Sequence, residues 1–93
     1  MRQTGRTTQQ MLEAPEGSIY IWVNQHLTRP RDVAEACGRT DLHIVSPAWL
    51  DLQNIMGCEF KGVVLDHALP MSDLSDAQFH ALQVAYTRVR VLP

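Results

Sequence analysis

The sequence predicts a small α/β domain with a three-stranded parallel sheet in the order 2-1-3 and helices on both faces, half of a Rossmann-like or flavodoxin-like fold. Three short apolar runs, at 19–23, 42–45 and 63–65, alternate with segments of helical pattern. This alternation favours parallel strands joined by right-handed crossovers. The first run is unbroken and rich in β-branched and aromatic residues, so it needs apolar cover on both faces. We therefore place it centrally, because the alternative order 3-2-1 leaves one face bare.

Length and composition bound the class of protein. The chain has 93 residues, of which 45% are apolar, and a formal net charge of -2, which suits one folded domain. No apolar run approaches the roughly 18 residues that cross a bilayer. We expect no signal peptide, no membrane partner and a cytoplasmic location, with Cys37 and Cys58 reduced. The net charge makes nucleic acid an unlikely partner, whether through Arg2 and Arg6 or through the arginines near residue 30.

The first segment of the chain, residues 1–17, predicts a flexible N-terminal arm. It is rich in Thr, Gln and Gly, and we expect only Met11 and Leu12 to bury apolar surface. Such a segment does not bury enough surface to offset its ordering entropy. Residues 18–93 then form the single α/β domain.

Two helices are expected between the strands. The first begins around Thr28 and Pro30 and ends at Gly38. The second is expected to be capped by Ser46 and to end at Gly57.

The last helix has the strongest local signal. Ser75 and Gln78 have the spacing of a capping box, and Leu74 precedes the cap. Arg88 and Arg90 stand in the final turn, where the helix dipole favours cations. An apolar stripe at helical spacing is formed by Phe79, Leu82, Tyr86 and Val89.

The predicted strand order also predicts a site. Ligands of open α/β sheets bind beyond the carboxyl ends of the strands, where the connections diverge to opposite faces. Here that crevice lies between the first and third strands. The candidate ligand-binding residues are Asn24, Gln25 and His26 after the first strand, Asp66 and His67 after the third, and Ser46 after the second.

Several chemistries are disfavoured by missing motifs. The only lysine, Lys61, does not end a glycine-rich phosphate loop, and no glycine follows the first strand as a dinucleotide fingerprint requires. The four histidines have no metal-binding spacing. The residues therefore favour a protein that is not an enzyme, and we predict no catalytic residues, no metal and no cofactor.

The segment 63–70, Val-Val-Leu-Asp-His-Ala-Leu-Pro, resembles the third strand of response-regulator receiver domains. There an apolar strand presents a phosphoaccepting Asp, and a Pro follows four residues later. Receivers place an acidic pair after the first strand, where this chain has Asn24 and Gln25, and their fourth and fifth strands have no counterpart here. The resemblance implies a related fold.

Two functions are compatible with these features. The first is a non-enzymatic protein-protein interaction module, expected to be an accessory or inhibitory protein of a phage or mobile element and able to form a homodimer through exposed sheet edges. Its interface candidates are Trp49, Arg29 and Arg31. The alternative is a nucleotide- or phosphate-binding domain with its site at the Asn24/Asp66 crevice. The partner, the oligomeric state and the ordering of the arm on binding stay open.

Overall fold

The computed structural model describes residues 3–91 and has a parallel sheet in the order β2-β1-β3. The central strand pairs with both neighbours, so that Tyr20 lies opposite Ile44 on one side and Val64 on the other. The predicted fold class and strand order are confirmed. The strands are β1 (Ile19–Ile21), β2 (His43–Val45) and β3 (Val63–Leu65).

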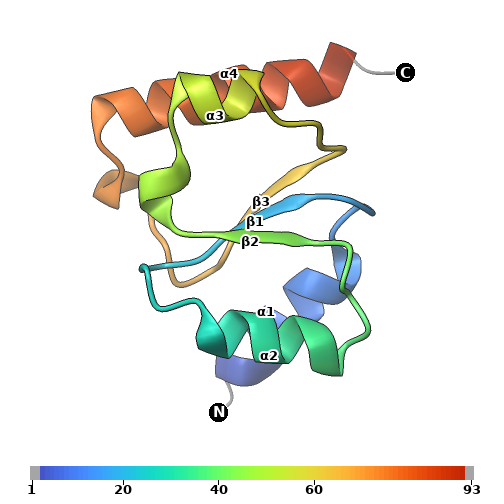
Figure 1. Ribbon diagram of the computed structural model, residues 1–93. Coiled ribbons are helices and arrows are strands. Elements are labelled where there is room, and N and C mark those ends of the chain that lie inside the picture. Colours follow the sequence, from blue (N-terminus) through green and yellow to red (C-terminus); the bar gives the residue numbers. More distant parts are fainter. Residues whose placement is uncertain (1–2, 92–93) are drawn as a thin grey trace.

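Helices cover both faces of the sheet (Figure 1). One layer holds α1 (Gln3–Glu13) and α2 (Thr28–Ala36), and the other holds α3 (Leu52–Met56) and α4 (Asp76–Val91). Every residue of β1 is buried, as the apolar run predicted. The central strand is therefore covered on both sides by helices that its own side chains hold in place.

The prediction of a loose arm is wrong for the described part of the segment. Residues 3–13 form α1, and Met11 is fully buried in a cluster with Ala14 and Tyr20. Thr7 of the same helix is also buried, at 5% exposure. This helix has only two apolar residues, Met11 and Leu12, so its attachment depends on a few side chains that reach the sheet.

The predicted second helix is divided in two. Pro47–Trp49 form a single 3-10 turn, and the chain is extended at Leu50 before α3 begins. Ser46 does occupy the N-cap position of this turn, but its side chain makes no capping hydrogen bond. Asp51 is the cap instead, because its carboxylate accepts a hydrogen bond from the Asn54 N–H at 2.8 Å. The break lets Leu50 turn into the core, where it is 3% exposed.

The capping box of α4 is confirmed. The Gln78 N–H donates to Ser75 Oγ at 3.1 Å, and the Ser75 N–H donates to Gln78 Oε1 at 2.9 Å. A short 3-10 helix, Met71–Asp73, precedes it. The buried face of α4 is shifted from the predicted stripe, because Phe79 is 39% exposed.

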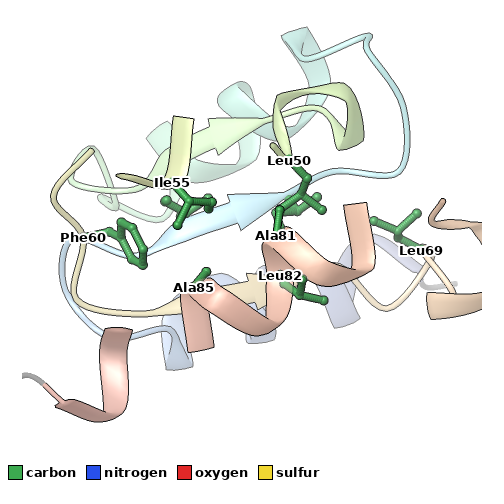
Figure 2. Close-up of a cluster of buried hydrophobic side chains, with 9 residues drawn as sticks. Leu50, Ile55, Phe60, Leu69, Ala81, Leu82 and Ala85 are labelled. Carbon is green, nitrogen blue, oxygen red and sulfur yellow. The ribbon is translucent and has the colours of Figure 1, made fainter. Parts of the chain in front are cut away.

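Small and large side chains alternate where α4 meets the sheet (Figure 2). Ala81 and Ala85 are small and let α4 approach the sheet closely, while the larger side chain of Leu82 fills the space between them. This cluster, the larger of two in the described chain, consists of Ile19, Ile21, Leu50, Ile55, Phe60, Leu69, Ala81, Leu82 and Ala85.

Candidate functional site

A cavity of about 210 Å³ lies beyond the carboxyl ends of β1 and β3, on the side of the sheet that α1 and α2 cover. We call it the crevice cavity. Its position agrees with the general rule for open α/β sheets, since β1 is where the connections diverge. It is lined by Thr7, Trp22, Val23, Arg29, Val33, Asp66, His67 and Ala68.

Asp66 lies at the wall of this cavity and is 1% exposed. Its Oδ1 accepts hydrogen bonds from the Tyr20 hydroxyl and from Thr7 Oγ1, the latter at 3.0 Å. Its Oδ2 accepts one from the Ala68 N–H at 3.0 Å. A buried carboxylate is tolerated only when donors surround it, and these three groups supply them.

Tyr20 is the donor that ties the central strand to this carboxylate. Burial raises the pKa of the Tyr20 hydroxyl, and the hydrogen bond to Asp66 and the negative charge of Asp66 raise it further. The hydroxyl therefore keeps its proton and acts as a donor. The arrangement holds Asp66 in a single orientation.

His67 is positioned by Gln10 of α1. Gln10 Oε1 accepts from the His67 N–H at 2.8 Å, and Gln10 Nε2 donates to the Leu65 carbonyl at 3.1 Å. His67 Nδ1 lies 3.2 Å from Gln10 Oε1 and 3.6 Å from Asp66 Oδ2, so it carries its hydrogen toward two acceptors. His67 Nε2 is buried and has no hydrogen-bond partner in the described structure.

The remaining walls combine apolar side chains with one arginine. Trp22 and Val33 belong to the partly buried residues that pack on the α1/α2 side, and Arg29 stands in the first turn of α2. Both oxygens of Asp66 are already acceptors for protein donors. The hydrogen-bonding capacity of Asp66 is therefore largely used within the protein.

The predicted site residues are divided between two places. Asp66 and His67 line the crevice cavity. The residues 24–26 turn toward β2 and share a more open hollow of about 300 Å³ with Ser46. Asn24 Oδ1 accepts from the His26 N–H at 2.8 Å, which closes a local turn. The loop after β1 therefore leaves the crevice that it was predicted to line.

Sequence reasoning missed six of the eight residues that line the cavity, and three of these six bear on its chemistry. Trp22 has a visible signal, because it lies two residues after Tyr20 on the chain and so shares its side of the sheet. Arg29 was predicted only as an interface residue. Thr7 gave no signal, since nothing in residues 1–17 marks it as the partner of Asp66.

The three interface candidates do not form one surface. Arg29 lines the crevice cavity and Arg31 is exposed on the same helix. Trp49 packs against the large core cluster on the other side of the sheet. Arg2 and the side chain of Arg90 lie outside the described residues.

The described residues also limit other kinds of site. Cys37 and Cys58 are free and half-buried. In residues 3–91, no three His, Cys, Asp or Glu side chains are grouped so that they could hold a metal ion. Over the same range, no helix has the length and apolar character that crossing a bilayer requires.

The local resemblance to receiver domains extends to strand order but not to the acidic residue. The order 2-1-3 agrees with the first three strands of flavodoxin-like folds. Asp66 does follow β3, yet it is 1% exposed and engaged by three donors. A phosphoaccepting carboxylate has to be reachable by a phosphate donor, so the structure does not support that role for Asp66.

The chain matches no protein-family model, no curated protein and no solved structure. Fold and cavity alone define its class. It is a small α/β domain with a candidate ligand cavity at the carboxyl edge of a three-stranded parallel sheet.

Proposed function

We propose that this protein binds a small organic carboxylate in the crevice cavity. The observation that carries the proposal is the composition of its walls, which combine apolar Trp22 and Val33 with cationic Arg29 and the hydrogen-bonded residues Asp66 and His67. Arginine binds carboxylates through two parallel hydrogen bonds. Three neutral donors engage the oxygens of Asp66 and hold it in the wall, so Arg29 is the group that attracts an anion to this cavity.

The cavity volume restricts the ligand to about one ring. A volume of about 210 Å³ is close to that of an engineered cavity of roughly 150 Å³ that accepts benzene. It lies below the roughly 300–1,000 Å³ of pockets that enclose drug-sized ligands. A whole nucleotide, the ligand first expected at this crevice, would extend outside it. A single-ring or short aliphatic acid fits better.

Benzoate titration tests the proposal. The chain has two tryptophans, so Trp49→Phe leaves Trp22 as the only fluorophore of this kind. We expect benzoate to change Trp22 fluorescence and raise Tm by linkage. The neutral isostere benzamide should bind more weakly, and Arg29→Gln should weaken benzoate binding about tenfold.

Arg31→Gln is the matched control, because Arg31 is exposed on the same helix and does not line the cavity. It should bind benzoate as the unaltered chain does. If both arginine variants behave alike, or if benzoate changes neither fluorescence nor Tm, the proposal is wrong.

A second candidate function, the protein-protein interaction module, is favoured by one observation. Leu52 and Met56 lie four residues apart on α3 and are 44% and 67% exposed. Beside Leu52, a shallow hollow of about 380 Å³ runs between α3 and α4. Two large apolar side chains on one exposed helix face are typical of a docking surface. A phage or mobile-element origin, a homodimer and a cytoplasmic location stay predictions.

Affinity capture tests this second function. The variant Leu52→Ser with Met56→Ser should lose a partner that the unaltered chain retains, without a loss of stability. Leu12→Ser is the control, since Leu12 is 56% exposed on α1, in the opposite helical layer. Equal retention by both variants would exclude α3 as the interface.

A further inference from the structure

Another hollow lies at the opposite end of the sheet, where the strands begin. Its volume is about 470 Å³, more than twice the roughly 210 Å³ of the crevice cavity. Gly17 precedes β1, His43 opens β2, residues 59–61 lead into β3, and Arg88 comes from α4. We call it the amino-end hollow. It is lined by Gly17, His43, Glu59, Phe60, Lys61 and Arg88.

The Arg88 guanidinium is held in place by groups that do not neutralise it. One of its terminal nitrogens donates to the Ile55 carbonyl and, at 3.2 Å, to the Cys58 carbonyl. Its central carbon lies 5.1 Å from the centre of the Phe60 ring. Among residues 3–91 it forms no ion pair. A half-buried cation is therefore fixed beside the hollow with only neutral partners.

Lys61 adds a second permanent charge. It is exposed, its ammonium has no acceptor in the described structure, and its stem passes close to the Gly17 backbone. Its neighbour Phe60 is 6% exposed and anchors the segment in the core. Glu59 is the only carboxylate among the six lining residues, and it is not within ion-pair distance of either cation.

The other well-placed cation at this end of the sheet is arranged differently. Arg39 is paired with Asp41 at 2.9 Å and donates to carbonyls at the end of α1. The charge of Arg39 is thus paired with a carboxylate, and its N–H groups are hydrogen-bonded within the protein. Lys61 and Arg88 form no ion pair with a carboxylate among residues 3–91, although the chain as a whole has a net charge of -2.

We propose that the amino-end hollow binds a small phosphate monoester. Such a group carries about -1.5 to -2 charges at neutral pH and offers three acceptor oxygens. Lys61 would supply a point charge and Arg88 the remaining guanidinium N–H donors. The volume of about 470 Å³ lies within the usual range for enclosed small ligands. This site is independent of the crevice cavity and of the carboxylate proposed for it.

Amide NMR with glycerol 3-phosphate as the probe tests the inference. We expect shifts at Gly17, His43 and Lys61, and none with glycerol. Lys61→Gln should weaken binding about tenfold, because it removes a charged donor. Glu59→Gln should strengthen binding, because it removes the only carboxylate among the six lining residues. Both side chains are exposed, so both variants are expected to fold.

Arg31→Gln removes an equal charge elsewhere on the surface and should leave binding unchanged. Sulfate distinguishes a phosphate site from general anion attraction and should bind more weakly than the monoester. Equal loss in Lys61→Gln and Arg31→Gln, or equal binding of sulfate, would overturn the inference. Shifts confined to the crevice residues would also overturn it, while leaving the proposed carboxylate site standing.

Discussion

The two helical layers are attached to the same three strands by different means. The α3/α4 layer packs through the large apolar cluster, in which Leu82 and Ile55 are fully buried. The α1/α2 layer has a smaller cluster around Met11, and its first helix is also bonded to the sheet through Thr7 and Gln10. The α3/α4 layer is held mainly by apolar packing, whereas the α1/α2 layer is held by apolar packing together with a buried polar network.

The way in which the α1/α2 layer is attached agrees with the position of the candidate site. A layer that is held in part by hydrogen bonds can surround a cavity without losing its position. The crevice cavity lies in the second layer, beside Asp66, at the carboxyl ends of the strands. If the two layers are held as described, substitutions in each layer should lower the free energy of unfolding by different amounts and should loosen different helices.

The largest effect is expected in the apolar layer. Leu82→Ala removes a fully buried side chain and should lower the free energy of unfolding by about 2–5 kcal/mol, because a cavity remains. Denaturant unfolding measures it. Phe79→Ala on the same helix, where Phe79 is 39% exposed, is the control and should cost clearly less. Equal losses would mean that α4 packs on the sheet with a different face from the one seen in the structure.

Asp66→Asn should weaken the polar layer by a smaller amount, about 2–3 kcal/mol. The amide cannot accept from both the Ala68 N–H and the hydroxyls of Thr7 and Tyr20, so at least one buried donor loses its acceptor. Amide hydrogen exchange should show α1 opening while α4 stays protected. Uniform loss of protection would show that the network is not specific to α1.

The contrast between the layers also explains what the sequence could predict. Strands, strand order and α4 follow from apolar periodicity and a capping box, which are signals within the chain. The helix α1 lacks such a signal, because its attachment depends on Thr7 and Gln10 meeting residues more than fifty positions away. Composition alone therefore made residues 1–17 resemble a loose arm.

The site was predicted in part for a similar reason. The strand order predicted a crevice beyond the ends of β1 and β3, and the structure has a cavity there that Asp66 lines. The direction of the loop after β1 depends on a local turn in which Asn24 accepts from the His26 N–H. That turn leads residues 24–26 toward β2. The break before α3 was visible in principle, since Asp51 stands three residues before Asn54 as a cap does.

Alkaline pH should weaken the polar layer through Tyr20. Its pKa is raised in the folded state, so its stabilising effect is complete below the unfolded value of about 10 and is lost as pH rises above that. We expect Tm to fall above about pH 10 and Tyr20→Phe to reduce the slope. Tyr86, whose pKa is also raised by burial, should supply part of what remains. An unchanged slope in Tyr20→Phe would contradict this assignment.

Acid should produce the smallest effect, at the other end of the α1 layer. The hydrogen bond from Arg39 and then the Gly17 N–H lower the pKa of Asp41 below its usual range. A lowered pKa means that the stabilisation is present above the unfolded value of about 3.9 and is lost as pH falls below it. Asp41→Asn should therefore lower Tm slightly at neutral pH, and the difference should vanish in acid. Asp32→Asn is the control, because it alters the net charge equally on the exposed side of α2. If the Tm difference between Asp41→Asn and the unaltered chain is the same at every pH, Asp41 acts through its shape rather than its charge.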